Sequence, residues 1–480
     1  MLRDLLLQGL VFFDFTILFY FFLLNTIYLL FTFVAFFDLR RHQRRWTASD
    51  LDAVMRSPDT PGISLVVPTF NEESTLEESL RSLLMLNYPQ HEVIVVNDGS
   101  KDRTLAVTIE AFDLVRAEVG AAAAIATREV RGVYRSLAYP NLTLIDKANG
   151  GKADAINAGI NVAQQPLVCV IDADSLLEPH ALTRAVLPFL EDPTTIAAGG
   201  IIRIANDCRV EGGRVVDVVL PRGALARFQV TEYLRAFLAG RVAQSVFNSL
   251  LIISGAFGLF RRDALLAVGG FDTTTVGEDM EIIVRLHRWC RENARPYRIV
   301  FRPDPVCWTE VPESLAVLAR QRNRWQRGTC QVLRRHYRMM GNPRYGMAGL
   351  LAMPFYLAFE ALGPLIEVAG YLVTIFAVAI GVLDWRFAEL LFLVAVCYGA
   401  LISLAAIILE EMSLRRYPRV LDLLILAAFG VLENFGYRQL TSWWRLRGVV
   451  DFLRGRGGWG AMPRRGFQRP VSGAAGAANS

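Results

Sequence analysis

Cysteine and lysine are both scarce in this chain. Its 480 residues include six cysteines, none of them in a Cys-x-x-Cys pair, and only three lysines, so 48 of its 51 basic residues are arginine. The cysteine pattern predicts neither a disulfide framework nor a zinc site. Cys169 and Cys397 lie in apolar runs, and we expect both to be core residues. Reduced thiols of this kind fit a catalytic part that lies in the cytosol.

An excess of charge of one sign is also lacking. The 51 basic and 46 acidic residues leave a net charge of +5, which is too small to indicate a nucleic-acid partner. Charged residues make up 20% of the chain, below the ~25% of soluble domains. Hydrophobic residues make up 53%, and the mean hydropathy is +0.32. This composition excludes a disordered, collagen-like or disulfide-rich chain and indicates segments that span a bilayer.

The first apolar run, residues 10–37, is 28 residues long and contains ten phenylalanines. A bilayer core needs about 20 helical residues, so this run can cross it, and it is too long for the apolar part of a signal peptide. It is followed by Arg40, Arg41, Arg44 and Arg45. The positive-inside rule therefore places this end in the cytoplasm and the N-terminus outside. We expect residues 1–45 to be a transmembrane helix with a basic flank; a buried core helix is the alternative.

Three further apolar runs follow the central part of the chain, at residues 347–383, 387–409 and 421–432. We expect residues 346–443 to form transmembrane or interfacial helices, and residues 444–480 to form a basic cytosolic tail whose last nine residues are disordered. Residues 438–480 carry eight arginines against one acid, which predicts a cytoplasmic C-terminus. Three C-terminal spans, added to the N-terminal one, would leave it outside, so either the first of these runs crosses twice or one segment is interfacial.

Residues 46–345 alternate short Val- and Ile-rich runs with helical patterns, which is typical of an α/β domain. The runs are apolar throughout, which predicts strands buried on both faces of a mostly parallel sheet. The expected strands are residues 63–67, 93–96, 142–145 and 167–171. The expected helices between them are residues 74–86, with Ser74 and Glu77 as a capping box, and residues 152–163 and 179–190.

Polar residues gather directly after each of the four expected strands. They are Pro68, Thr69, Asn71 and Glu72 after the first, Asp98 after the second, Asn149 to Lys152 after the third, and Asp172 and Asp174 after the fourth. In open α/β sheets, ligands bind outside the carboxyl ends of the strands. We therefore expect one shared site for a polar ligand, although a single acid at a strand end is commonly a helix cap or part of a turn.

The Asp172-Ala173-Asp174 sequence is the clearest single signal. In extended backbone the two carboxylates point the same way, about 6–7 Å apart. Hard oxygen ligands at a strand end suit Mg²⁺ or Mn²⁺ shared with a substrate diphosphate. The alternative, two acids in a loop, is less favoured because a buried strand comes before them.

All three lysines, Lys101, Lys147 and Lys152, lie in this same region. A compact ammonium is a good point-charge partner for phosphate. Lys152 follows two glycines and opens a helix, whose N-terminus also attracts phosphate. For Lys101 and Lys147, a chance position in an arginine-biased chain is the alternative.

A glycine-flanked loop and an acidic helix start follow further along the chain. Ser254 and Gly255 begin the loop, which allows close approach of its backbone. Glu278 and Asp279 precede a helical pattern at residues 280–289. From spacing alone, adjacent acids at this point are best explained as partners of the helix dipole.

Gln321, Arg324 and Trp325 lie on a basic amphipathic stretch, residues 318–339. One hypothesis is a helix that lies on the membrane surface. The other is a helix that directs an arginine and an indole into the polar site. The two hypotheses are compatible.

Seven motifs occur in one order: PTFNEE, VNDGS, GGK, DAD, SGAFG, GED and QRNRW. This order resembles the membrane-embedded family 2 glycosyltransferases, the group of hyaluronan, chitin-oligosaccharide, cellulose and poly-N-acetylglucosamine synthases. The resemblance covers about residues 60–330, with membrane segments on both sides, and QRNRW fits the QxxRW motif of that group. It implies a GT-A fold, with a Rossmann-like mixed α/β sheet in a cytosolic domain. It also implies an inverting, Mg²⁺- or Mn²⁺-dependent transfer of a hexose from a UDP-sugar.

The resemblance also implies roles for individual residues. Nucleotide and donor would be held by Pro68, Thr69, Asn71, Glu72, Asp98, Lys152, Asp172, Gln321 and Arg324. The metal would be held by Asp174 and Asp172, with Asp174 the favoured ligand. Asp279 would be the catalytic base, with Glu278 beside it, and the acceptor would be bound by Ser254, Gly255 and Trp325.

The sequence departs from the group in places. Asn323 and its neighbours Arg322 and Arg327 make the QRNRW stretch more basic. Residues 111–139 and 212–223 look like insertions that would reshape access for the acceptor. We find no receptor domain for cyclic di-GMP, so regulation by that nucleotide would need another subunit.

Together these features predict a processive β-glycosyltransferase of the inner (plasma) membrane, which extends a polysaccharide at the cytoplasmic face and exports it. UDP-GlcNAc is favoured over UDP-Glc, because the motifs are closer to the chitin and poly-N-acetylglucosamine synthases. The alternatives are a non-processive enzyme that glycosylates a membrane lipid and a non-catalytic export scaffold, which would need no metal site. The expected partners are the UDP-sugar, the growing polysaccharide or lipid acceptor, membrane lipids, and a separate regulatory or export subunit.

The last apolar run holds only 12 residues, too few to span a bilayer unless the helix continues through Glu433 and Arg438. Charges at membrane depth face a cavity or a partner. One hypothesis is that Glu433 or Arg438 lines a channel for the growing chain, with Glu360 or Glu367 pairing with Arg438. The alternative is that the run lies at the interface and residues 433–444 are already cytoplasmic.

Overall fold

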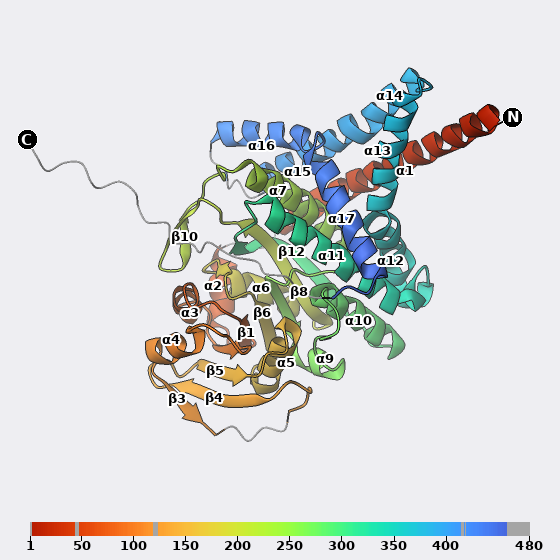
Figure 1. The fold of residues 1–480 in the computed structure, drawn as a ribbon. Coiled ribbons are helices and arrows are strands. Elements are labelled where there is room, and N and C mark those ends of the chain that lie inside the picture. Colours follow the sequence, from red (N-terminus) through yellow and green to blue (C-terminus); the bar gives the residue numbers. More distant parts are fainter. Residues whose placement is uncertain (1, 44–47, 119–122, 414–416, 418, 458–480) are drawn as a thin grey trace, which may run out of the picture.

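The computed structural model describes residues 2–43, 48–118, 123–413, 417 and 419–457. Its central sheet has ten strands in the order β3-β4-β5-β2-β1-β6-β11-β8-β12-β7 (Figure 1). Their bounds are β1 (Ile63–Thr69), β2 (His91–Asn97), β3 (Leu114–Ala117), β4 (Val130–Ser136), β5 (Leu142–Lys147), β6 (Leu167–Ile171), β7 (Leu176–Leu177), β8 (Thr195–Ile204), β11 (Phe257–Arg261) and β12 (Arg298–Thr309). The predicted α/β class is confirmed.

The four expected strands, β1, β2, β5 and β6, pair in parallel at the centre of the sheet. Every residue of β5 and β6 is buried, because helices pack on both faces of a parallel sheet. The sheet is mixed rather than mostly parallel, because β11 runs antiparallel between β6 and β8 at one side and β4 runs antiparallel to β5 at the other. The carboxyl ends of the four central strands therefore share one edge.

The helices that pack around this sheet are α2 (Ala48–Arg56), α3 (Leu76–Leu84), α4 (Thr104–Ala111), α5 (Lys152–Val162), α6 (Ala181–Glu191), α9 (Arg262–Ala267) and α10 (Glu278–Glu292). The predicted capping box at Ser74 and Glu77 is wrong. Helix α3 begins one residue later than that box requires, after Thr75, and it has no side-chain cap. The Thr75 hydroxyl instead donates to Glu72 Oε2 at 2.9 Å.

The two segments that look like insertions lie at the periphery of the domain that holds the sheet. Residues 111–139 contribute β3 and β4, which extend the sheet antiparallel to β5. Residues 212–223 include β10 (Arg214–Asp217), which pairs with β9 (Arg209–Glu211) in a small hairpin. Ser82 Oγ of α3 donates to the Gly213 carbonyl at 2.8 Å and holds this hairpin. None of the described residues of either segment lines the cavity described below.

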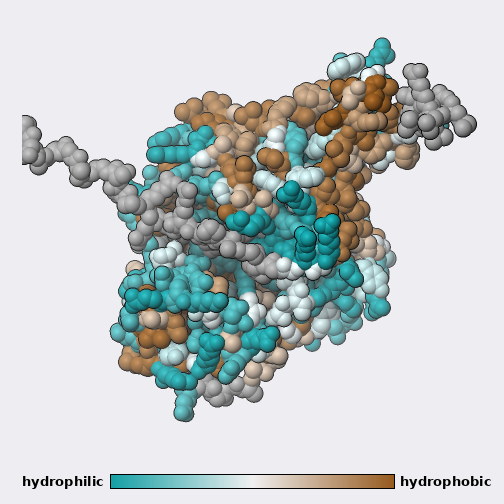
Figure 2. Space-filling view, in the orientation of Figure 1, coloured by the Kyte–Doolittle hydropathy of each residue, from teal (hydrophilic) through white to brown (hydrophobic). Residues whose placement is uncertain are grey.

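Three helices are long and apolar enough to cross a membrane: residues 8–41 within α1 (Leu2–Gln43), residues 348–379 and residues 385–412. The second contains α12 (Met353–Phe355), α13 (Gly363–Ala379) and two π-helical segments, and the third contains α14 (Trp385–Phe392) and α15 (Tyr398–Ser413). Figure 2 shows the largest brown, hydrophobic zone over this part of the molecule. The run at 347–383 thus forms one candidate span of 32 residues rather than two. Arg44 and Arg45 lie outside the described residues, as does the nine-residue terminal segment expected to be disordered.

Cys169 is buried in β6, as expected, but Cys397 is exposed, so the prediction of a core position for it is wrong. Cys397 ends a π-helical segment whose five residues are all unburied in the isolated chain. An apolar run on a membrane-facing helix does not require burial within the protein, because lipid can cover it.

The last two helices, α16 (Val420–Leu432) and α17 (Tyr437–Leu453), meet at a bend of 56° and could form a span only together. Leu426 of α16 packs in a cluster with Ala226 and Val230 of α7 (Ala224–Tyr233). Helix α17 packs along α11 (Leu315–Arg335), where Asn323 Nδ2 donates to Asp451 Oδ2 at 2.8 Å. Both helices therefore lie against the domain that holds the sheet. The predicted domain boundary at residue 444 falls inside α17.

Candidate active site

One cavity of about 1270 Å³ lies at the carboxyl ends of β1, β2 and β6 and extends to α1, α13 and α17. Fourteen of the predicted site residues line it: Pro68, Thr69, Asn71, Glu72, Asp98, Lys152, Asp172, Ser254, Gly255, Glu278, Asp279, Gln321, Arg324 and Trp325. Asp174 is the remaining one, and it does not line the cavity. The structure thus brings residues from seven separate motifs to one place.

Lys152 sits among oxygen atoms at the start of α5. Its Nζ lies 2.5 Å from Asp172 Oδ1, 3.1 Å from the Gly255 carbonyl oxygen and 3.9 Å from Glu278 Oε1. Burial alone would lower the pKa of Lys152, but Asp172 and Glu278 outweigh it and raise the pKa above its ordinary value. A permanent positive charge therefore lies beside Asp172. Gly151 precedes it with φ 89°, which a residue with a side chain rarely adopts.

Asp98 and Lys147 support the loop that carries Lys152. Asp98 Oδ1 accepts from Gly150 N–H at 2.9 Å and from Lys147 Nζ at 2.6 Å, and its Oδ2 accepts from Gly151 N–H at 2.8 Å. Lys147 is fully buried and also pairs with Asp154 at 2.6 Å. Lys147 is neither the expected partner for phosphate nor placed by chance, because this buried ammonium pairs with two carboxylates and does not line the cavity.

The loop after β1 is tied to the loop after β2. Asn71 adopts φ 57°, donates its N–H to Ser100 Oγ at 3.0 Å and accepts from Lys101 N–H at 2.8 Å. Glu72 N–H donates to Thr104 Oγ1 at 2.9 Å. Lys101 therefore contributes its backbone to the shape of this wall, while its side chain is exposed.

Asp172 and Asp174 carry the carboxylates that we expected to hold a metal. Asp172 lines the cavity, and Asp174 is buried with 5% exposure. Among the described residues, no three His, Cys, Asp or Glu side chains come together as a complete metal cage. Mg²⁺ commonly binds through one or two carboxylates together with substrate phosphates. The Asp172–Asp174 pair offers hard oxygen donors for a cation of that kind but would not hold one alone, and the Lys152 ammonium, which pairs with Asp172, is placed to meet the phosphates instead.

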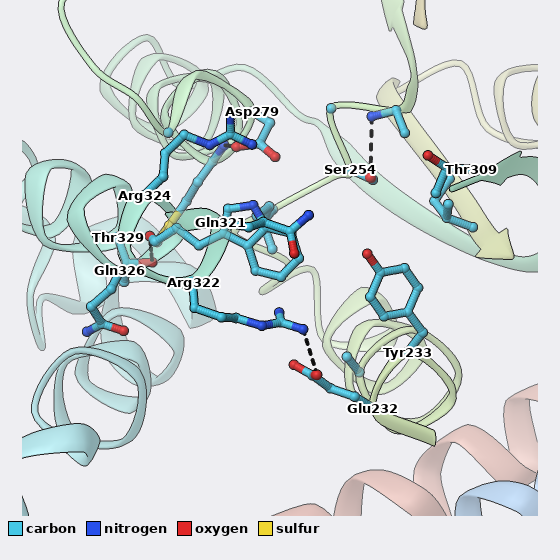
Figure 3. A pocket seen from close by; sticks show the side chains of 18 of the residues that line it. Glu232, Tyr233, Ser254, Asp279, Thr309, Gln321, Arg322, Arg324, Gln326 and Thr329 are labelled. Atoms are coloured by element: carbon cyan, nitrogen blue, oxygen red, sulfur yellow. Dashed lines mark hydrogen bonds and ion pairs between the residues drawn. The ribbon is translucent and has the colours of Figure 1, made fainter. Parts of the chain in front are cut away.

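Glu278 and Asp279 differ in environment although they are adjacent. Burial raises the pKa of Glu278 to about 7, with Asp279 adding to the rise and Lys152 opposing it. Asp279 is half-buried and points into the cavity, where Figure 3 places it at the same end as Arg324. Asp279 is the carboxylate that a ligand can reach. Glu278 faces Lys152.

Gly255 brings these two groups close together. A Cβ at this position would lie 3.0 Å from Lys152 Nζ and 3.6 Å from Asp279 Oδ2. A side chain at position 255 would therefore fill the space between the Lys152 ammonium and the Asp279 carboxylate. Ser254, before it, accepts from Ala256 N–H through its Oγ at 3.3 Å (Figure 3).

Helix α11 presents Gln321, Arg324 and Trp325 to the cavity, after Ser314 caps its start by accepting from Val317 N–H. Trp325 is 42% exposed, so part of its side chain is open to a ligand. The Arg322 guanidinium lies 4.5 Å from the centre of the Trp325 ring and holds it in place. The hypothesis that this helix directs polar and aromatic groups into the site is consistent with these positions.

The wall of the cavity that faces α11 was not predicted from the sequence. It is formed by α7, the π-helical segment Leu234–Arg241 and α8 (Val242–Val246). Figure 3 shows Glu232 and Tyr233 of this wall across the pocket from Arg322 and Gln321, and Arg322 Nη2 lies 2.7 Å from Glu232 Oε2. No sequence pattern marks a π-helix, although such segments are frequent at functional sites.

Three ion pairs line the part of the cavity that is built from the membrane helices. They are Arg438–Glu367 at 3.4 Å, Arg445–Glu360 at 2.8 Å, and Arg235–Glu433. The expected partnership of Arg438 with Glu367 is confirmed, whereas Glu360 pairs with Arg445 instead. Glu433 and Arg438 both line the cavity, as one of the two hypotheses for this segment requires.

This combination of fold and site is that of a glycosyltransferase. The family model described as "Glycosyltransferase like family 2" matches residues 61–328, which is more than half of the chain. The chain therefore belongs to glycosyltransferase family 2.

Two groups of relatives give more detail. The poly-beta-1,6-N-acetyl-D-glucosamine synthases of Staphylococcus epidermidis and Staphylococcus aureus (strain COL) are each 30% identical over 277 residues, which are 58% of this chain and 56% of theirs. The chain thus matches little more than half the length of these relatives. A mannosyltransferase from Pyrobaculum calidifontis, solved with GDP-Man and Mn²⁺, is 20% identical over 90% of this chain and all of its own, with a TM-score of 0.50. This likeness identifies the same GT-A fold.

Proposed function

We propose that this protein is a processive, inverting β-glycosyltransferase that builds a polysaccharide from a UDP-sugar and passes it through the membrane. The observation that carries the proposal is the single cavity, which joins the loops at the strand ends to the membrane helices. A chain extended at Asp279 can continue from there along Glu367, Glu433 and Arg438 without leaving the protein. UDP-GlcNAc is the favoured donor, supported by the likeness to poly-beta-1,6-N-acetyl-D-glucosamine synthases.

The proposed reaction is a single displacement. An acceptor hydroxyl oxygen attacks C1 of the donor sugar, a new C1–O bond forms as the bond from C1 to the UDP oxygen breaks, and the hydroxyl proton passes to Asp279. One base suffices for inversion, and Asp279 is the half-buried carboxylate that faces the cavity. The leaving electron pair goes to UDP, whose added charge is stabilised by Lys152 and Arg324.

A divalent cation, Mg²⁺ or Mn²⁺, would supply further neutralisation of the departing diphosphate. Asp172 and Asp174 would hold it, together with the diphosphate oxygens. Glu278 supports this arrangement from behind, because its carboxylate lies 3.9 Å from Lys152 and helps keep that side chain in place. The remaining wall residues, Asn71, Glu72 and Asp98, would shape the nucleotide end of the cavity, and Trp325 would offer a ring face to the acceptor sugar.

The packing of the last two helices supports one orientation in the membrane. Helices α16 and α17 both pack on the domain that holds the sheet. We propose that the bent pair is interfacial or re-entrant and that three spans cross the inner (plasma) membrane. With the N-terminus outside, three spans place α17 and the arginine-rich end of the chain on the cytoplasmic side, together with the catalytic domain.

A lipid acceptor is the second candidate. The apolar side chains of Leu24, Phe355 and Phe359 line the cavity next to its ion pairs, and they would suit an acyl or prenyl chain. Such an enzyme would use the same base and the same donor wall, but it would add one sugar and release the product sideways into the bilayer.

Product length separates the two functions. The purified full chain in detergent is incubated with one UDP-sugar at a time, and the products are sized. A ladder or a high polymer made from UDP-GlcNAc supports the proposal, and a single-sugar glycolipid supports the second candidate. The control is Asp279→Asn, which should bind UDP-GlcNAc within a few-fold of the wild type but transfer no sugar, since the base acts in the transition state. Absence of UDP release from every UDP-sugar would overturn both functions.

A further inference from the structure

One face of α11 lies along the segment that leads to Asp279. This segment, residues 268–277, joins α9 to α10, and Asp279 is the second residue of α10. The α11 residues that contact it include Gly328, Gln331 and Arg335. They follow Arg324 at intervals of four, three and four residues, which places all of them on one face of the helix. The face that presents Arg324 to the cavity therefore also holds the segment before Asp279.

Gln331 makes the hydrogen bonds of this face that lie nearest to the start of α10. Its Oε1 accepts from Thr275 Oγ1 at 2.9 Å and from the Val276 N–H at 3.0 Å. The same Thr275 hydroxyl accepts from the Gly277 N–H at 3.1 Å, so one amide oxygen fixes three consecutive residues. Val276 and Gly277 line the cavity, whereas Gln331 does not. Gln331 therefore acts on the site through the backbone that it holds.

The remainder of the segment is anchored to α5 and to the end of α11. Arg335 pairs with Asp272, and its Nη2 donates to Thr274 Oγ1 at 2.6 Å. On the other side, Asn157 of α5 exchanges two hydrogen bonds with the backbone of Phe271, at 2.7 and 2.8 Å. The structure thus ties the segment to the two helices that carry proposed donor-binding side chains.

Two contacts between the segment and α11 act in opposite directions. The backbones of Gly277 and Gly328 already lie against each other, so the segment cannot move closer to the helix. Gln331 opposes separation, because moving the segment away would leave the Thr275 hydroxyl and the Val276 N–H without their acceptor. Thr275 is buried, and a buried donor that loses its partner is costly. The gap between the segment and the helix is therefore fixed from both sides.

We propose that Gln331 is a positioning residue for the base, which holds Asp279 at a fixed distance from Arg324. The inference rests on the proposed function, in which Asp279 takes the proton of the acceptor hydroxyl while Arg324 stabilises the departing diphosphate. Figure 3 places these two side chains at the same end of the pocket. A base has to lie within hydrogen-bond reach of the proton that it removes, so its distance from the donor end of the site decides the rate.

The test measures kcat and KM for sugar transfer from UDP-GlcNAc by the purified full chain. In Gln331→Leu, which has a similar size but no acceptor oxygen, kcat should fall roughly 10- to 100-fold because the base is displaced. KM for UDP-GlcNAc should stay within about three-fold of the wild type, because Lys152 and the loops at the strand ends are untouched. Gln331→Glu keeps an oxygen that accepts both hydrogen bonds, and its kcat should be within about five-fold of the wild type. A merely structural role would lower the melting temperature without this split between kcat and KM.

A second pair of variants tests the same contact from the side of the segment. Thr275→Val removes the hydroxyl between Gln331 and Gly277, and it should lower kcat less than Gln331→Leu does, because the Val276 N–H keeps its acceptor. Thr275→Ser keeps the hydroxyl and should keep kcat. Arg334→Gln is the matched control, because Arg334 lies in the same part of α11, is exposed and does not line the cavity. Each variant is assayed well below its melting temperature.

Asp279→Asn, assayed in parallel, separates this inference from the function on which it rests. Loss of transfer in Asp279→Asn with unchanged kcat in Gln331→Leu would overturn the positioning role alone, as would equal losses in Gln331→Leu and Gln331→Glu. Transfer by Asp279→Asn at the rate of the wild type would overturn the proposed base, and this inference with it. Absence of UDP release by the wild type from every UDP-sugar would overturn the proposed function itself.

Discussion

The backbones of Gly277 and Gly328 meet with no side chain between them. A Cβ at Gly328 would lie 2.9 Å from the Gly277 Cα, and a Cβ at Gly277 would lie 2.9 Å from the Gly328 Cα. Gly277 precedes Glu278 and Asp279, and Gly328 lies one turn after Trp325 on α11. The contact therefore fixes the distance between the proposed base and the helix that carries Gln321, Arg324 and Trp325.

Gly328→Ala should weaken catalysis more than it weakens the fold. The added methyl group forces α10 and α11 apart, which costs about 1–3 kcal/mol of stability when a packed site is overfilled. A displacement of about 1 Å at the reacting groups can cost roughly 100-fold in rate. Steady-state UDP release and a thermal melt on the same sample measure both effects. Gly9→Ala is the control, because nothing lies within 4 Å of that position, and equal activity of the two variants would contradict the argument.

The metal assignment predicts loss of turnover when either the ion or its ligand is removed. Asp174→Asn, and separately EDTA, should reduce the rate by about 10²–10³ or more, because a leading electrostatic contribution to the departing diphosphate is lost. Mg²⁺ or Mn²⁺ added back after EDTA should restore the wild type but not the variant. Full activity in EDTA would show that Lys152 and Arg324 are sufficient and that the metal assignment is wrong.

The strands at the centre of the sheet were predictable because burial on both faces leaves a continuous apolar run. β6 begins and ends at the expected residues, and β1, β2 and β5 extend the expected strands by two or three residues each. β11 was not predictable in the same way. Its position depends on pairing with β6 across about 90 residues of chain, as in the register of Phe257 with Ile171, and no local pattern encodes such pairing.

The residues of the site also differ in whether local sequence patterns could predict them. The residues at strand ends could be found because a parallel sheet gathers its carboxyl ends at one edge. Arg241 and Gln244, which also line the cavity, could not be found in this way, because their position depends on a π-helical segment. No local pattern in the sequence indicates such a segment. The ion pair of Arg235 with Glu433 joins residues 198 positions apart. Such pairs form only when the membrane helices pack on the catalytic domain.

Glu278 predicts a dependence of stability on pH. Burial raises the pKa of Glu278 to about 7, above its ordinary value of 4.5, so the folded chain binds this proton more tightly than the unfolded chain does. The stability that the protonated Glu278 contributes to the folded chain is therefore fully present below about pH 4.5 and is lost as the pH rises through 7. Melting temperatures of the wild type and Glu278→Gln between pH 5 and 8 should diverge, with the wild type losing stability relative to the variant. Parallel curves would mean that Glu278 is ionised throughout.

The ion pairs of the membrane part predict a separation of synthesis from export. Removing one partner leaves a buried charge, which costs about 3–5 kcal/mol, so Glu433→Leu or Arg438→Leu alone tests folding as well as transport. The double variant Glu367→Gln with Arg438→Gln removes both charges of one pair. It should keep hydrolysis of the UDP-sugar in detergent but secrete shorter or less polymer from cells. Secretion of product of normal length and amount by all three variants would show that Glu433 and Arg438 do not line the export path.

The proposed topology predicts on which side of the membrane positions 59, 385 and 457 lie. One cysteine is added at Asp59 before β1, at Gly457 after α17, or at Trp385, where the third candidate span begins, in a chain with Cys397→Ser. All three positions are exposed in the structure. An impermeant thiol reagent on intact cells should label Trp385→Cys and spare Asp59→Cys and Gly457→Cys, whereas all three should react after the cells are opened. The contact of α17 with α11 is the reason, since Asn323 and Asp451 can only meet on one side of the membrane. Labelling of Gly457→Cys in intact cells would mean that α16 and α17 together form a fourth span.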